Sequence, residues 1–160
     1  MSMAQELKSR GESVSRWVTF RLGSETYGID VMQVREVLRG TEISPVPGAP
    51  SYVLGIINLR GNVVSIIDTR SRFGLPPHDM DDASRILILE AGDHAIGFLV
   101  DSVCEVAELR ASEVESAPDT GAGDAAQFIS GLSNRKVGLL ILVDASKLLS
   151  DEELSELSSF

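Results

Sequence analysis

Short runs in which apolar and polar residues alternate follow one another along most of the chain, a pattern typical of half-buried β-strands. In residues 17–30, WVTFRLGSETYGID, two such runs flank Gly23, which predicts a hairpin. Paired runs of the same kind occur at 52–68, 85–103 and 127–144. The pattern therefore predicts an all-β fold made of hairpins.

Two segments carry helical signals instead. Val31, Val34 and Leu38 share one face at helical spacing, and Asp30 before them is a suitable N-cap, which predicts a short helix after the first hairpin. Residues 150–160 begin with the spacing of a capping box and predict a C-terminal helix and tail. Both helices are short, so the fold class stays all-β.

The chain also repeats itself, first at an offset of 69 residues and then, beyond the middle loop, at an offset of 76. Polar and glycine positions take part as well as apolar ones, which makes a chance match improbable. The matched pairs are Gly28 and Gly97, Val34 and Val103, Glu36 and Glu105, Val37 and Val106, Gly55 and Gly131, Asn58 and Asn134, and Arg60 and Lys136.

This repeat predicts two similar small units, at approximately 16–75 and 84–150, within one domain that spans 16–150. Each unit has about five short strands, and a sheet of that size avoids exposed edges by closing into a barrel. Neither unit has many apolar residues of its own, so we expect an apolar seam between them. Residues 1–15 are polar and aperiodic and are interpreted as a flexible N-terminal tail.

Composition narrows the class of function. The net charge of −10 and the absence of a basic cluster argue against nucleic-acid binding, which depends on cationic contacts to phosphate. The single cysteine, Cys104, allows no internal disulfide and fits a reducing cytoplasm. The N-terminus has no signal-peptide pattern, and no apolar run approaches the roughly 20 residues that span a bilayer.

Catalytic chemistry finds little support in the sequence. His78 and His94 lie in a polar linker and a turn, and we expect both to be exposed, without metal-ligand spacing. Cys104 lies in an apolar-patterned segment and is expected to be a buried, inert thiol. The GAGD stretch at 121–124 lacks the lysine and hydroxyl of a phosphate loop. We predict no catalytic, cofactor or metal site.

Four stretches, FRLGSETYGIDVMQVREVL, YVLGIINLRGNVVSIIDTRSRFG, AIGFLVDSVCEV and LILVDASKLL, together resemble the CheW family of chemotaxis coupling proteins, over about residues 16–150. The resemblance implies two intertwined five-stranded SH3-like β-barrels. It also implies a non-enzymatic, cytoplasmic adaptor that joins the tips of methyl-accepting chemoreceptors to the regulatory domain of the histidine kinase CheA. Such a protein is a monomer alone and joins kinase domains in rings within membrane-associated arrays, without inserting into the membrane.

The resemblance also implies site residues. The receptor-binding candidates are Val31, Val34, Glu36, Gly55 and Arg60, and the kinase-binding candidates are Gly97, Val103 and Val106. The residues themselves leave alternatives open, because valines can be core, glycines can serve folding, and an arginine in a turn can be merely solvated. We expect Arg60 and Glu36 to lie near each other or on one rim.

Two other functions remain open at this point. A protein of the same family could serve a parallel array that controls pili or biofilm. A small barrel could instead bind a small ligand or catalyse a minor reaction, for which a deep polar pocket between the barrels would be the sign. The loop at 117–126 receives no role.

Overall fold

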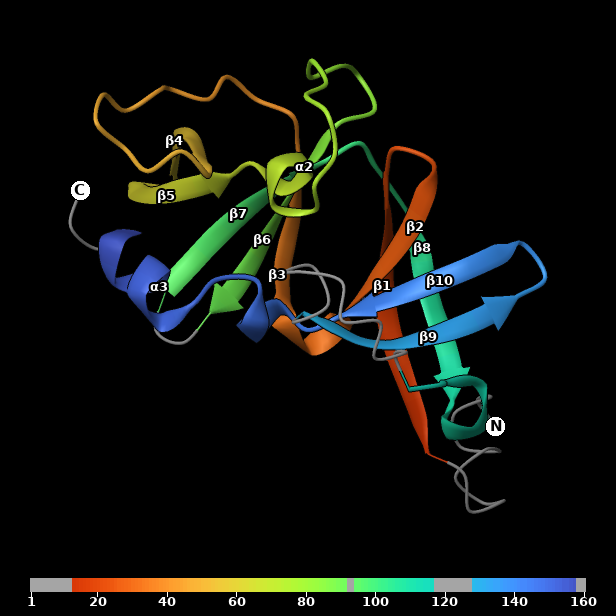
Figure 1. The fold of residues 1–160 in the computed structure, drawn as a ribbon. Coiled ribbons are helices and arrows are strands. Elements are labelled where there is room, and N and C mark those ends of the chain that lie inside the picture. Colours follow the sequence, from red (N-terminus) through yellow and green to blue (C-terminus); the bar gives the residue numbers. More distant parts are fainter. Residues whose placement is uncertain (1–12, 92–93, 117–127, 158–160) are drawn as a thin grey trace.

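The computed structural model of the chain describes residues 13–91, 94–116 and 128–157, and its strands form two five-stranded sheets (Figure 1). Pairing is antiparallel except between β2 and β10 and between β5 and β7. In sheet A the order is β8 (Ser102–Arg110), β1 (Val14–Leu22), β2 (Glu25–Asp30), β10 (Gly138–Val143) and β9 (Ile129–Arg135). In sheet B the order is β3 (Val34–Arg39), β6 (Arg85–Ala91), β7 (His94–Val100), β5 (Asn62–Ile67) and β4 (Val53–Leu59).

The two sheets are copies of one another, and the predicted all-β class with two five-stranded units is confirmed. Replacing each strand of sheet A by its repeat equivalent gives the strand order of sheet B, so that β8 corresponds to β3, β1 to β6, β2 to β7, β10 to β5 and β9 to β4. Sheet A lies to the right and sheet B to the left in Figure 1.

The contiguous boundaries at 16–75 and 84–150 need a correction, because each sheet takes strands from both halves of the chain. Sheet A joins the first hairpin, β1–β2, to the last three strands, and sheet B joins the remaining three strands of the first half to β6–β7. The chain crosses between sheets at Val31–Gln33 and again at Asp101. Strand patterns fix which faces are buried but not which strands become partners, so this exchange was not visible in the sequence.

The helix expected after the first hairpin is mostly wrong. A single 3₁₀ turn, η1 (Val31–Gln33), is present, and Asp30 caps it by accepting a hydrogen bond from the Met32 backbone nitrogen at 2.9 Å. From Val34 onward the chain is strand β3, paired with β6. Cross-strand packing against the apolar residues of β6 outweighs the helical spacing.

The expected C-terminal helix is confirmed as α3 (Asp151–Leu157). Its capping box is formed by a bond from the Ser150 nitrogen to Glu153 Oε1 (2.9 Å) and one from the Glu153 nitrogen to Ser150 Oγ (3.1 Å). The described residues also form the short helical elements α2 (Thr69–Arg72), η2 (Ala111–Glu113) and η4 (Ala145–Lys147). Strand β1 begins at Val14, so the end of the segment predicted as a tail belongs to sheet A. Residues 1–12 lie outside the described part.

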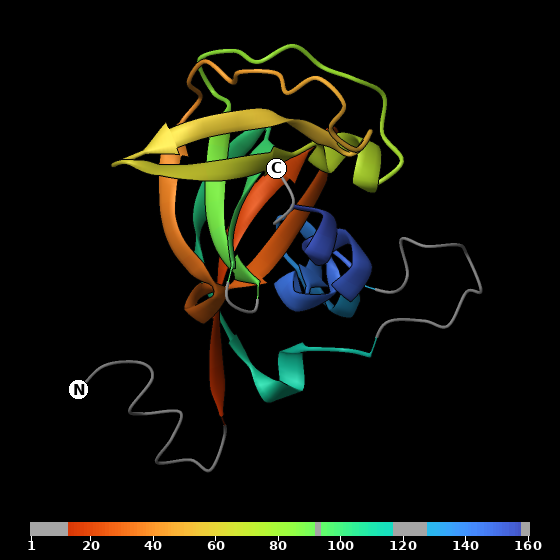
Figure 2. The same cartoon turned by 90° about the vertical axis from the view of Figure 1, so that its left-hand side faces the viewer.

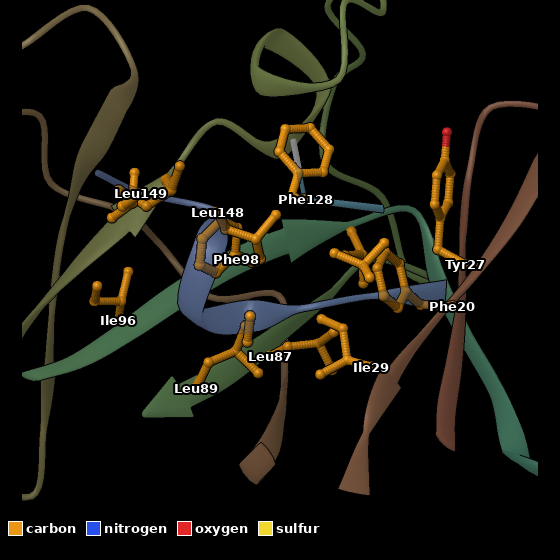
Figure 3. Close-up of a cluster of buried hydrophobic side chains, with 14 of the residues drawn as sticks. Phe20, Tyr27, Ile29, Leu87, Leu89, Ile96, Phe98, Phe128, Leu148 and Leu149 are labelled. Carbon is orange, nitrogen blue, oxygen red and sulfur yellow. The ribbon is translucent and has the colours of Figure 1, made fainter. Parts of the chain in front are cut away.

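The largest core lies between the sheets, as the apolar seam predicted, and combines side chains from both sheets with the C-terminal segment (Figure 3). Strand β6 shows how the seam and a barrel interior are filled together. Leu87 and Leu89 belong to the seam, whereas Ile86 and Ile88 belong to a separate cluster within sheet B. Sheet A has its own smaller cluster around Leu109 and Leu140.

Both crossings between the sheets are held by side chains. At the first, Gln33 donates to Asp144 Oδ1 and accepts from the Ala145 nitrogen, each at 3.2 Å. At the second, Asp101 accepts from Arg70 Nε (3.0 Å) and Nη2 (2.6 Å) and from the Gly23 nitrogen (2.7 Å). These bonds, added to the shared core, favour a fixed orientation of the two sheets.

Candidate functional site

The turn between β4 and β5 has an unusual backbone. Its two central residues, Arg60 and Gly61, have φ values of 51° and 88°, the combination of a type I′ hairpin turn. Asn58 supports the turn, because its Oδ1 accepts a hydrogen bond from the Gly61 nitrogen at 2.9 Å. Among the described residues, Arg60 is the only non-glycine with positive φ. A glycine or asparagine would suit this position better, so the arginine side chain is kept there at a conformational cost.

The Arg60 side chain forms an ion pair with Glu36, which confirms the expectation that the two lie together. Nη1 of Arg60 lies 3.2 Å from Oε1 of Glu36, and Nη2 bonds to Oε2. The hydrogen bonds from Arg60 lower the pKa of the Glu36 carboxyl, so the carboxylate is charged at neutral pH. Glu36 is on β3 and Arg60 follows β4, so the pair bridges the two outer strands of sheet B.

The ion pair lies beside a surface groove of about 390 Å³. The Arg60 side chain is 69% exposed and that of Glu36 30%, so the remaining N–H groups of the guanidinium stay available at the surface. Val63, 63% exposed, provides an apolar wall, and His94 lies on the same groove. Sequence reasoning missed Val63, although the adjacent valines Val63 and Val64 break the strand alternation and give a signal for it.

The equivalent place in sheet A carries a similar ion pair with a different arginine. Arg135 Nη2 lies 2.8 Å from Oε1 of Glu105, the repeat equivalent of Glu36. Lys136, the repeat equivalent of Arg60, is exposed and is not the residue that pairs. Both hairpins therefore carry an arginine that pairs with a glutamate. In sheet B this arginine lies in the turn, whereas in sheet A it is the last residue of strand β9.

The valine candidates divide between core and surface. Val31, Val34 and Val103 are half-buried and pack against the seam between the sheets. Val106 is 53% exposed, and its repeat equivalent Val37 is 42% exposed. Of the two kinase-binding valines, Val103 therefore fits the core alternative and Val106 the surface one.

The glycine candidates are buried, which favours the folding alternative over direct contact. A Cβ at Gly55 would lie 2.3 Å from the Ser44 carbonyl oxygen, and one at Gly97 would lie 2.4 Å from Ile66 Cδ1. Close approach of neighbouring atoms thus explains both glycines. Substitutions at either position are expected to act through packing.

Two expectations about reactive groups have different outcomes. His78 and His94 are exposed, as expected, but Cys104 is exposed too, so its expected burial was wrong. Cys104 lies on the outer strand β8, where residues 104–106 all face solvent and the apolar pattern fails. The part of the chain that the structure describes contains no cluster of His, Cys, Asp and Glu side chains able to hold a metal ion. The stretch at 121–124 and the loop at 117–126 lie outside the described residues.

In the described ranges no helix is long and apolar enough to cross a membrane. The fold and its surfaces define a class of protein, a double β-barrel with charged hairpin turns and a surface groove beside one of them.

Comparison with known proteins identifies the family. Residues 16–153 match the model of the CheW-like domain, and the chain belongs to the CheW family. It is 34% identical to chemotaxis protein CheW of Klebsiella aerogenes, over 96% of this chain and 93% of the relative. It is 36% identical to chemotaxis protein CheW of Treponema pallidum, over 89% of this chain and 86% of the relative.

A solved structure supports the same assignment. The scaffolding protein TtCheW from Thermoanaerobacter tengcongensis superposes with a TM-score of 0.79 at 30% identity, covering 87% of this chain and 94% of that one. The fold and the sequence therefore point to one family.

Proposed function

We propose that the chain is a chemotaxis coupling scaffold that joins methyl-accepting chemoreceptors to the histidine kinase CheA. Relatives named chemotaxis protein CheW, similar over nearly the whole chain, support this proposal. The scaffold works in the cytoplasm, without catalysis of its own, by holding a receptor tip and the CheA regulatory domain against different faces of one body. Alone it is a monomer, and with kinase domains it joins rings.

The observation that carries the receptor side is the left-handed arginine at the β4–β5 turn. Strained residues cluster at functional sites, and here the strain retains a long cationic side chain at an exposed tip. Glu36 holds two nitrogen atoms of that guanidinium, which fixes its direction before any partner arrives. Pre-organisation of this kind lowers the entropic cost of binding.

The groove beside this pair has the chemistry that a receptor tip requires. A helical partner binds through apolar anchors and a small number of charges. Val63 offers the apolar contact, and Arg60 offers the charge to an acidic residue of the receptor. Val31 and Val34 belong to the proposed receptor side as half-buried support for η1 and β3.

The kinase side is proposed on β8. Val106 is the contact candidate because about half of its surface is exposed, and Val103 supports the strand from the seam. Gly55 and Gly97 enter the proposal only as packing residues, since both are buried.

The test of the proposed function is reconstitution of kinase activity from receptor, CheA and this protein. We expect receptor-dependent activation of CheA only when the chain is present, together with binding to each partner in a pull-down. Equal kinase activity with and without the chain, or binding to neither partner, would contradict the proposal.

The Arg60→Gly variant tests the receptor side sharply. Glycine adopts positive φ readily, so this substitution removes the guanidinium while relieving backbone strain, and the thermal midpoint should not fall. Receptor coupling should be lost. The matched control is Arg135→Ala, which breaks the equivalent ion pair of sheet A and should leave receptor binding intact. A folded Arg60→Gly variant with unchanged coupling would remove Arg60 from the proposed site.

A further inference from the structure

A second hollow lies away from both hairpin tips, between α2, the start of β4 and the C-terminal segment. It has a volume of about 470 Å³, in the range of small-ligand sites. Figure 2 shows the C-terminal segment, in blue, packed below α2. The lining residues are Ser51, Tyr52, Ser71, Arg72, Phe128, Lys147, Leu148, Ser150 and Glu153.

This hollow forms where the two copies of the repeat meet. Tyr52 and Phe128 are repeat equivalents, and their backbone oxygens accept equivalent hydrogen bonds. The donor is the backbone nitrogen of Asp68 for Tyr52 (2.8 Å) and that of Asp144 for Phe128 (2.9 Å). Ser71 is likewise equivalent to Lys147, at the same offset of 76. The walls therefore come from corresponding segments of the two copies whose side chains differ. One wall carries Arg72 and the other carries Lys147.

The first cation, Arg72, is held firmly. Its guanidinium carbon lies 5.1 Å from the centre of the Tyr52 ring, and its Nη2 bonds to Glu153 Oε2. The Tyr52 hydroxyl lies 2.9 Å from Glu156 Oε2, and burial, followed by this bond, raises the pKa of Tyr52. Nη1 of Arg72 makes no hydrogen bond to any described residue.

The second cation, Lys147, is exposed at the other wall, and its ammonium forms no ion pair with any described residue. Glu153 is the only carboxylate in the lining, and its charge is already engaged by Arg72 and by the Ser150 nitrogen. The hydroxyl groups of Ser51 and Ser71 add possible donors. The lining itself therefore carries two cations and serine hydroxyls against one engaged carboxylate. Two further carboxylates lie just outside the lining, Glu156 on the Tyr52 hydroxyl and Asp144 near Lys147.

We propose that this hollow, the inter-repeat pocket, binds a small oxyanion, either a phosphate group or a carboxylate. Lys147 supplies a mobile point charge, Arg72 a fixed one, and the serine hydroxyls complete the hydrogen bonding. Phe128 and Leu148 form the apolar floor. This proposal does not depend on receptor or kinase binding.

The experiment is a titration of the full chain, followed by amide chemical shifts, with inorganic phosphate in one arm and succinate in the other. Potassium chloride at matched ionic strength is the blank. We expect saturable shifts for residues 51–52, 71–72 and 147–150, and the arm with the tighter binding identifies the anion class. Lys147→Ala should weaken binding roughly tenfold, as for loss of one charge-assisted hydrogen bond.

The matched control is Lys136→Ala, which removes an exposed lysine at the β9–β10 turn and should leave the titration unchanged. Because Lys147 is exposed, its substitution should leave the thermal midpoint near that of the parent, which separates loss of binding from loss of fold. Shifts no larger than those in chloride, or equal binding by Lys147→Ala, would overturn the proposal.

Discussion

The two hairpin tips occupy equivalent places in the two sheets but present their charge differently. At the β4–β5 tip the arginine stands in the turn, in a left-handed conformation, and reaches Glu36 across the mouth of sheet B. At the β9–β10 tip Arg135 ends the strand and reaches Glu105, while Val137 in the turn is 86% exposed. The partner glutamates correspond in the repeat and the arginines do not. The duplicated backbone has thus been kept while its outer surfaces have diverged.

Interior positions of the two copies have diverged less. Gly28 and Gly97 face close neighbours in both sheets, and Gly55 and Gly131 each lie beside the segment that forms a bridge to the outer strand. Glycine persists where a side chain would meet backbone or core. We therefore expect substitutions at the two hairpin tips to affect different functions. Substitutions at equivalent interior glycines should both lower stability, by different amounts.

The largest expected difference is in the free energy of unfolding of the equivalent variants Gly55→Ala and Gly131→Ala. A Cβ at Gly55 would meet the Ser44 carbonyl oxygen at 2.3 Å, whereas one at Gly131 would lie 3.0 Å from the Glu115 oxygen. Gly55→Ala should lower the free energy of unfolding by about 3 kcal/mol and Gly131→Ala by about 1 kcal/mol, because backbone atoms cannot move aside cheaply. Urea denaturation measures both. Equal losses would show that the Ser44 segment can yield.

The next largest difference is in the stability lost when each of the two crossings between the sheets is weakened. Asp101→Asn should cost about 2 kcal/mol at pH 7, because it leaves Arg70 without its charged partner, whereas Gln33→Ala should cost about 1 kcal/mol. The hydrogen bonds from Arg70 chiefly lower the pKa of Asp101 in the folded state. The contribution of Asp101 is then complete above its unfolded pKa of about 4 and is lost as pH falls through the lower folded value.

Urea denaturation of the parent and of Asp101→Asn from pH 7 down to pH 3 tests this sign. The gap between the two proteins should narrow as the pH falls. A gap that stays constant or widens would contradict the role given to the Arg70–Asp101 pair.

A smaller difference is expected in CheA binding when the equivalent valines Val106 and Val37 are replaced. Val106→Ser should weaken CheA binding by about fivefold, because an exposed apolar contact at an interface is lost. Val37→Ser removes a valine of similar exposure from the other sheet and should leave CheA binding unchanged. Isothermal titration with the CheA regulatory domain measures both, and equal weakening would move the kinase surface away from β8.

The sequence predicted the elements better than their assembly. Strand runs, the repeat, the seam and the Arg60–Glu36 contact followed from local pattern, shared offsets and the family resemblance. The exchange of hairpins between the sheets did not, because alternation specifies faces and leaves strand partners open. The same limit explains Val34, whose helical spacing was overridden by pairing with β6, and Cys104, whose apolar neighbours lie on an outer strand.

The inter-repeat pocket illustrates a second limit. Arg72 and Lys147 are far apart in the sequence and carry no motif, and they line one pocket only because corresponding segments of the two copies lie side by side. A repeat read from sequence predicts such a junction, but it does not predict what the diverged side chains form there.

The most direct test of the central claim, that Arg60 acts on a receptor rather than only on Glu36, is receptor binding by the charge-exchanged double variant Glu36→Arg with Arg60→Glu. The exchange can restore an internal ion pair while reversing the charge shown at the tip. We predict a folded protein that still binds CheA and no longer binds receptor tips. Receptor affinity equal to that of the parent would mean that the pair serves only the fold, and would contradict the account.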